Sequence, residues 1–190
     1  MSPGKEVIVA NKLYGGSINL MGKSFRKFGW NAVFVDNDNP EAFRAAVTDK
    51  TRAIFVESLA NPGGVIVDLE AIAKIAQEAE VPLIVDNTMA TPWLCRPFEW
   101  GADLVVHSTT KFLSGQGNAM GGIVIDSGRF PWFGNAKYPS LSEPCPDYNG
   151  LTFAETFGDM AFTLYSHAVS LRDLGCTQSP MNAWITLNGL

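Results

Sequence analysis

Short apolar runs alternate along the chain with segments in which apolar residues recur at helical spacing. Six runs of four or five residues consist mainly of Val, Ile, Leu, Phe and Ala, and each is followed by a polar residue. They are Glu6–Ala10, Ala32–Val35, Ala53–Val56, Pro82–Val85, Asp103–His107 and Gly122–Ile125. Because these runs are continuous rather than alternating, we expect strands that are buried on both faces of a sheet.

Helical patterns fill the intervals between the runs. Apolar residues three and four apart predict a helix within Gly15–Phe28, and Pro40 takes the place of a first helical residue before Glu41–Val47. The clearest helix extends from Asp68 to Ala79, with acidic residues at its positive end. Its apolar stripe consists of Leu69, Ile72, Ala73 and Ala76. Strands alternating with helices predict an α/β fold of three layers, with a mostly parallel sheet between flanking helices.

The carboxyl-terminal third has a different pattern. Residues 131–150 contain four prolines interleaved with aromatic residues, which indicates an ordered loop or lid rather than a flexible linker. A helical pattern resumes over Phe153–Leu174, and Asn182–Leu190 reads as the beginning of another helix. The first residues lead almost directly into a strand, and we therefore expect this chain to be part of a longer protein.

Composition narrows the function classes. The chain has 190 residues, of which 46% are hydrophobic and 17% charged, and this disfavours disorder and coiled coil. A net charge of −5 without a dense Lys/Arg tract argues against nucleic acid or an anionic membrane as a partner. No apolar run approaches the ~18 residues that a membrane span requires.

Cysteine and histidine usage predicts neither a disulfide framework nor a metal centre. The three cysteines, Cys95, Cys145 and Cys176, are widely spaced, and only two histidines, His107 and His167, are present. We expect structural thiols in a reducing cytoplasm.

Two strand ends carry clustered polar residues. Asp86 follows one apolar run, and Ser108, Thr110 and Lys111 follow the next. Ligands of open α/β sheets bind at the carboxyl ends of strands, so neighbouring strands would bring a carboxylate, two hydroxyls and an amine into one crevice. A buried carboxylate needs a partner, for which a cationic ring nitrogen is one solution, and the two hydroxyls could both donate to a phosphate.

Each of these residues also has an ordinary structural interpretation. An Asp after a strand is most often a turn former, a Ser-Thr-Thr-Lys run is usually surface loop, and a lone Tyr such as Tyr14 usually packs. Gly115-Gln116-Gly117 lacks the rest of a dinucleotide fingerprint, which places a nucleotide-binding domain last among the alternatives.

Taken together, two long stretches favour the chemical interpretation. Val85–Pro97 and Gly101–Phe112 resemble the PLP-dependent transsulfuration family of cysteine and methionine metabolism. The resemblance covers nearly the whole chain. It implies the large domain of fold type I, incomplete at both ends, with pyridoxal 5'-phosphate as the cofactor.

The resemblance also implies roles for single residues. Lys111 matches the lysine that bonds covalently to the cofactor and then carries protons, and Asp86 matches the aspartate that pairs with the pyridine nitrogen. Such a lysine must be neutral to react, which burial and nearby positive charge favour.

The remaining matches concern the ring and the phosphate. Ser108 and Thr110 match hydroxyls at the phosphate, Tyr14 matches the tyrosine that stacks on the ring and takes part in catalysis, and Asn61 matches the asparagine near the ring hydroxyl. Asn61, Asp86 and Lys111 follow one another at intervals of 25 residues, as in the family.

The segments Leu94–Pro97, Gly115–Asn118 and Leu141–Pro144 are most similar to the sulfhydrylase branch of the family. That branch implies γ-replacement on O-acetyl-L-homoserine by sulfide, giving L-homocysteine and acetate in methionine biosynthesis. Activity of the cystathionine γ-synthase or γ-lyase type stays open, as does a non-catalytic module.

The family layout implies more than these 190 residues hold. We expect residues 1–175 to form the PLP-binding large domain and 176–190 to begin the connection to a small carboxyl-terminal domain. A Gly-Met phosphate loop upstream of Tyr14 and a substrate-binding arginine in the small domain are missing from this sequence. The resemblance also implies a homo-oligomer, a dimer of dimers, and we do not expect full activity from these residues alone.

Overall fold

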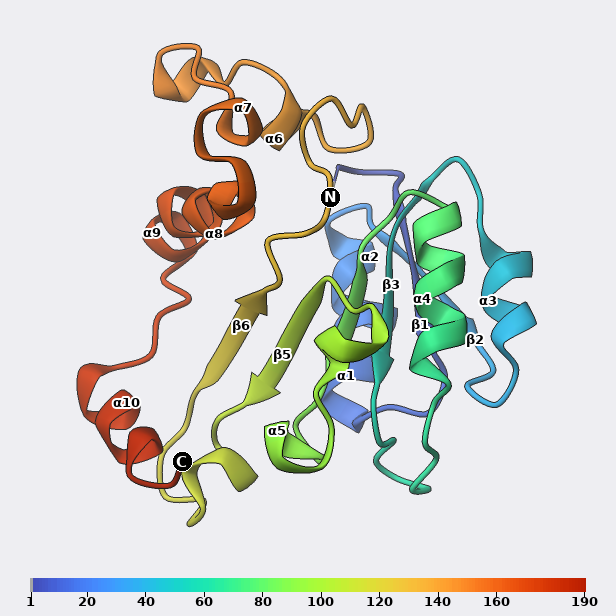
Figure 1. The fold of residues 1–190 in the computed structure, drawn as a ribbon, viewed down its shortest axis with the longest axis vertical. Helices are drawn as coiled ribbons and strands as arrows, with labels where there is room; N and C mark the ends of the chain where they lie inside the picture. The colour runs from blue at the N-terminus through green and yellow to red at the C-terminus, as the bar shows by residue number, and fades with distance from the viewer. Residues whose placement is uncertain (1) are drawn as a thin grey trace.

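The computed structural model describes residues 2–190 and contains a six-stranded sheet in the order β2-β1-β3-β4-β5-β6 (Figure 1). All six predicted strands are present, each within two residues of its expected bounds. They are β1 Glu6–Ala10, β2 Asn31–Val35, β3 Thr51–Glu57, β4 Leu83–Asp86, β5 Leu104–Ser108 and β6 Gly122–Asp126. The first five strands pair in parallel, and β6 pairs with β5 in the antiparallel direction.

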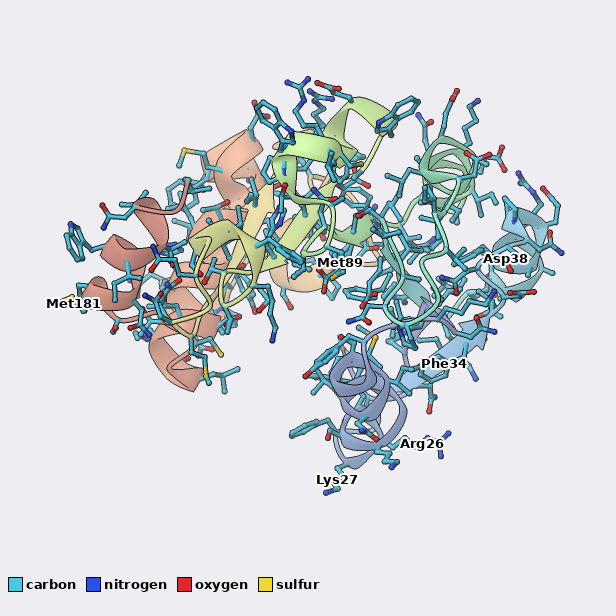
Figure 2. All side chains as sticks on the ribbon, turned by 90° about the horizontal axis from the view of Figure 1, so that it is seen from below. Arg26, Lys27, Phe34, Asp38, Met89 and Met181 are labelled. Atoms are coloured by element: carbon cyan, nitrogen blue, oxygen red, sulfur yellow. The ribbon has the colours of Figure 1, made fainter. Side chains whose placement is uncertain are left out.

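Helices cover both faces of the sheet, as three layers require. The crossover from β1 to β2 lies on one face of the sheet, and the crossovers that follow lie on the other face; Figures 1 and 2 both show this arrangement. The first face carries α1 (Gly15–Asn19), the π-helical turn η1 (Leu20–Ser24) and α2 (Phe25–Lys27), and the second carries α3 (Pro40–Ala46), α4 (Leu69–Glu78) and α5 (Thr91–Leu94). Strand β1 lies between β2 and β3, so the direction of winding reverses there. In α/β sheets, such a switch point opens a crevice at the carboxyl ends of the strands.

Side-chain caps explain where two predicted helices begin. The Asn39 side chain accepts a hydrogen bond from the Glu41 N–H, with Pro40 as the first helical residue of α3. The Asp68 carboxylate accepts from the Ala71 N–H at 3.0 Å and starts α4. The predicted helix within Gly15–Phe28 is also present but contains the π-helical turn η1, and of its apolar residues only Met21 is fully buried.

The main core lies between the sheet and these helices. Phe43 of α3, Ile72 of α4, and Ile8, Ile54 and Leu83 of the strands have no exposed surface. The expectation of burial on both faces is wrong for the edge strands, because a strand with one neighbour is less covered: in β6, Ile123 and Val124 are exposed.

Residues 131–150 contain the short helices α6 (Pro139–Ser142) and η4 (Pro146–Tyr148). They belong to a second apolar cluster, in which the rings of Trp132 and Phe162 stack with centroids 5.5 Å apart. The Tyr138 hydroxyl donates to the Arg52 carbonyl over 2.8 Å and connects this cluster to the sheet.

The helical pattern over Phe153–Leu174 is interrupted in the structure. Gly158 has a φ of 52° and ends the first segment, a backbone conformation that glycine adopts without strain. The segments are α7 (Phe153–Phe157), η5 (Gly158–Met160), α8 (Ala161–Tyr165), the π-helical η6 (Ser166–Leu171) and α9 (Arg172–Leu174). The last helix, α10 (Pro180–Leu187), begins two residues before its prediction and contacts η3 (Phe112–Ser114). Among residues 2–190, no helix combines the length and apolar character needed to cross a membrane.

Candidate functional site

A cleft of about 740 Å³ lies at the carboxyl ends of β3, β4 and β5. Figure 2 looks onto this end of the sheet, with Met89 of the cleft near the centre of the view. All six candidate residues line this one cleft: Tyr14, Asn61, Asp86, Ser108, Thr110 and Lys111. The expected convergence of the two polar strand ends is therefore confirmed, because β4 and β5 are neighbours.

Asp86 ends β4 and is half-buried. Its Oδ1 accepts two hydrogen bonds from Thr88, one from the backbone N–H at 2.9 Å and one from the hydroxyl at 2.5 Å. The same hydroxyl oxygen accepts from the Ser108 N–H at 2.8 Å, so Thr88 connects the end of β4 to the end of β5. Thr88 was not among the predicted site residues, although a hydroxyl two residues after an Asp is typical of such a turn.

The β5 end places Ser108 half-buried in the cleft and Lys111 at its exposed rim. The backbone N–H of Lys111 donates to the Ser108 carbonyl over 3.2 Å. Lys111 is exposed, so the burial that would favour a neutral, reactive lysine is not provided by residues 2–190.

Thr110 differs from the expected free hydroxyl. Its Oγ1 donates to the Gly121 carbonyl at 3.2 Å and accepts from the Gly121 N–H at 3.0 Å. A hydroxyl has a single proton, so donation to a phosphate requires that the bond to the Gly121 carbonyl be given up.

Tyr14 and Asn61 lie in the turns that follow β1 and β3. The Tyr14 side chain is 54% exposed and bends back over the start of α1. A Cβ atom at Gly16 would lie 2.4 Å from Cε1 of Tyr14, so the glycine makes room for the ring.

Glu57, which was also not among the predicted residues, binds the backbone of both turns. One carboxylate oxygen accepts from the Tyr14 N–H at 2.7 Å, and the other accepts from the Asn61 N–H at 2.9 Å. A charged residue that directly ends an apolar strand was the signal available in the sequence.

Two carboxylates lie side by side at this end of the sheet, since Glu57 and Asp86 are register partners in β3 and β4. Burial raises the pKa of the Glu57 carboxyl, its two backbone N–H donors lower that pKa, and the charge of Asp86 raises it. Burial lowers the pKa of the neighbouring His107, whose Nδ1 has no hydrogen-bond partner among residues 2–190.

The donor set fits pyridoxal phosphate. A carboxylate for a protonated ring nitrogen, an amine for an aldehyde, a ring for stacking and hydroxyls for a phosphate all line the same cleft. A larger groove of about 1120 Å³ lies between α4 and residues 129–137 and contains none of the six candidates. Residues 2–190 contain no group of three His, Cys, Asp or Glu side chains placed to hold a metal ion.

A sequence profile of the Cys/Met metabolism PLP-dependent enzymes matches residues 1–190. The chain belongs to this family. An O-acetyl-L-homoserine sulfhydrylase of Leptospira meyeri is 47% identical over 195 residues, which are 98% of this chain and 44% of that protein. A homocysteine synthase of Schizosaccharomyces pombe is 40% identical over 189 residues, again with 44% of its length covered. The chain thus spans less than half the length of these relatives.

Solved structures agree with this membership. An O-acetylhomoserine (thiol)-lyase of Campylobacter jejuni, which contains a pyridoxyl-lysine monophosphate, superposes with a TM-score of 0.95 at 38% identity. The match covers 99% of this chain and 47% of that one. A cystathionine γ-lyase of Lactobacillus plantarum, complexed with L-serine, gives a TM-score of 0.75 at 28% identity. The predicted α/β large domain of a PLP enzyme is therefore confirmed.

Proposed function

We propose that this chain is the cofactor-binding part of an enzyme that converts O-acetyl-L-homoserine and sulfide into L-homocysteine and acetate. The observation that carries the proposal is the gathering of Tyr14, Asn61, Asp86, Ser108, Thr110 and Lys111 around one cleft. The sulfhydrylase and homocysteine synthase names of relatives at 40–47% identity support the choice of reaction.

Pyridoxal phosphate, when bound, supplies an electron-withdrawing ring that stabilises the electrons left when the substrate loses its α-proton. Asp86 would hold the ring nitrogen in its protonated form through the carboxylate. Oδ2 is available for this, since the hydrogen bonds within residues 2–190 engage Oδ1 alone. Ser108 would donate to the phosphate, with Thr110 beside it.

Lys111 would hold the cofactor covalently and then act as the proton carrier. Its Nζ would take the proton from Cα of the substrate, pass that proton on to the cofactor, and then take one from Cβ, so that acetate can leave from Cγ with the bonding electrons. After sulfide adds at Cγ, protons would return to Cβ and Cα by the same route. The side chain has four flexible methylenes, which suits one base that serves two adjacent carbons. Tyr14 would stack on the ring, and Asn61 would lie near the ring hydroxyl.

Two alternatives compete with this reaction. The likeness to a cystathionine γ-lyase favours γ-lyase or cystathionine γ-synthase chemistry on the same cleft. The products separate these three reactions. The sulfhydrylase forms homocysteine from O-acetylhomoserine and sulfide, the γ-synthase forms cystathionine with cysteine, and the γ-lyase forms an oxo acid by elimination. The second alternative is a non-catalytic module, which stays open because the chain covers 44% of the length of a relative such as the Leptospira meyeri protein.

We further propose that residues 1–175 are the large domain, that residues 176–190 begin the connection to a small domain, and that the enzyme works as a homo-oligomer, a dimer of dimers. Cys95, Cys145 and Cys176 are all free thiols, which is consistent with the proposed cytoplasmic location.

Covalent labelling tests the cofactor site directly. The chain, mixed with pyridoxal phosphate, should develop a visible absorbance band that borohydride abolishes, and a mass spectrum of the reduced protein should place the modification on Lys111. Lys111→Ala should lose the band and the label. Lys27→Ala, at the far end of the first helical crossover (Figure 2), should retain both. If the label is distributed over several surface lysines and Lys111→Ala retains as much of it as the wild type, the proposed cofactor site is wrong.

A further inference from the structure

Glu57 is a carboxylate inside the protein with no cationic partner among residues 2–190. Its exposed fraction is 4%, and its hydrogen bonds come from the backbone amides of Tyr14 and Asn61. An ionised carboxylate is costly to bury, and short bonds from N–H donors compensate for part of that cost. The two backbone N–H donors therefore explain how a carboxylate is tolerated at this buried position, which packing alone does not explain.

The two amides belong to turns that are 47 residues apart in sequence and lie on opposite sides of the switch point. Tyr14 follows β1, where the chain turns into α1, and Asn61 follows β3, four residues after Glu57 itself. Glu57 thus connects the two strand ends between which the crevice opens. The N–H of Tyr14 precedes the first turn of α1, where backbone donors have no partner within the helix.

We propose that Glu57 is a positioning residue, which fixes the Tyr14 and Asn61 turns on the two sides of the cofactor cleft. The cofactor part of this inference rests on the proposed function. Glu57 touches no reacting atom in this role: it acts by setting where the Tyr14 ring and the Asn61 side chain stand.

Glu57→Gln is the sharpest variant because it keeps the size of the side chain. An amide has one acceptor oxygen, and its NH₂ group would face an N–H donor, so one of the two turns must be released. Glu57→Asp keeps two acceptor oxygens and the charge but is one methylene shorter, so it should show the same pattern to a smaller degree. It serves as the second variant if Glu57→Gln does not fold. Glu155→Gln, at an exposed position of α7, is the matched control.

Amide hydrogen exchange, measured by mass spectrometry on the chain without added cofactor, tests whether Glu57 holds the two turns. In Glu57→Gln, the peptide of the released turn, which contains either Tyr14 or Asn61, should exchange about tenfold faster, which corresponds to the loss of one hydrogen bond to a charged group. Peptides from α4 should be unchanged, and Glu155→Gln should match the wild type throughout. Unchanged exchange in both turns would overturn the proposal.

A double-mutant cycle on cofactor affinity tests whether Glu57 acts through Tyr14. Glu57→Gln should weaken pyridoxal phosphate binding about tenfold in the wild-type background and only about threefold in Tyr14→Ala. Equal effects in the two backgrounds would show that Glu57 does not act through the Tyr14 ring, and would overturn the inference that it fixes both sides of the cleft.

The two experiments separate this inference from the proposed function. If the wild-type chain forms no borohydride-sensitive band, the proposed function fails, and the cofactor part of the inference fails with it. The exchange experiment, which needs no cofactor, would still decide whether Glu57 holds the two turns.

Discussion

At the scale of single residues, hydrogen bonds to side chains hold the cleft together. Thr88 binds Asp86 and Ser108, and Glu57 binds the Tyr14 and Asn61 backbones. Two of these bonds, Ser108 to Thr88 and Tyr14 to Glu57, join residues from different strand ends, so the cleft is shaped before any cofactor enters. Binding a ligand to a preformed site costs less ordering entropy than assembling the site around it.

Thr88→Val should show what the bridge between Asp86 and Ser108 contributes. Valine keeps the shape but removes the hydroxyl, which leaves the Ser108 N–H without its acceptor. We expect the free energy of unfolding in urea to fall by about 1–3 kcal/mol, the cost of an unsatisfied donor. Thr88→Ser, which keeps the hydroxyl, should stay within about 1 kcal/mol of wild type. Equal losses in the two variants would assign the effect to packing and not to the bridge.

At the scale of helices and strands, the sequence predicts what is local. Apolar runs located all six strands, and Pro40 and Asp68 marked the starts of α3 and α4, because side-chain burial and the preferences of the first helical turn act over a few residues. The strand order and the reversed direction of β6 depend on pairing between segments far apart, which no local pattern encodes. The break at Gly158 was missed because an isolated glycine is tolerated within helices.

The same distinction holds for the candidate site. Lys111, Asp86 and their neighbours were found from motifs contiguous in the sequence. Glu57 and Thr88 were missed because their importance lies in bonds to backbone amides of other strand ends. The bonds of Thr110 to Gly121, which occupy its hydroxyl, likewise cross from one strand end to another and have no signal in the sequence.

The opposite, amino-terminal end of β4 and β5 predicts a pH dependence. Asp103 accepts from the Leu83 N–H at 2.9 Å, and burial raises its pKa to about 6, a shift that this bond opposes and Asp126 enlarges. A carboxyl whose pKa is higher in the folded state adds stability below its unfolded pKa and loses it as the pH rises through about 6.

Asp103→Asn should remove this dependence. The free energy of unfolding of wild type minus that of the variant should be about 1–2 kcal/mol larger at pH 4 than at pH 7, after discounting the shift for partial exposure. Urea denaturation of both proteins at several pH values measures it, with Asp49→Asn, at an exposed site, as the control. A difference that is constant over this range would mean that Asp103 titrates alike in the folded and unfolded chain.

At the scale of the whole molecule, β6 forms an edge of the sheet that carries exposed apolar side chains. Strand β6 pairs with β5 alone within residues 2–190, and its side chains Ile123 and Val124 are 45% and 59% exposed. In Figure 1, the helices α8 to α10 lie beyond β6, and no strand continues the sheet on that side. An exposed apolar edge strand is a template for pairing with another chain.

Val124→Lys should therefore reduce self-association of this chain without weakening its fold. A lysine on an edge strand opposes pairing, whereas the exposed position of Val124 implies that its replacement costs no more than about 0.5 kcal/mol in unfolding free energy. Light scattering over a range of protein concentrations should show a lower average mass for the variant. Leu174→Lys removes an apolar side chain that is 75% exposed in α9, outside the sheet, and adds the same charge. If both variants lower the mass equally, net charge is the cause, and if neither does, self-association uses a surface other than β6.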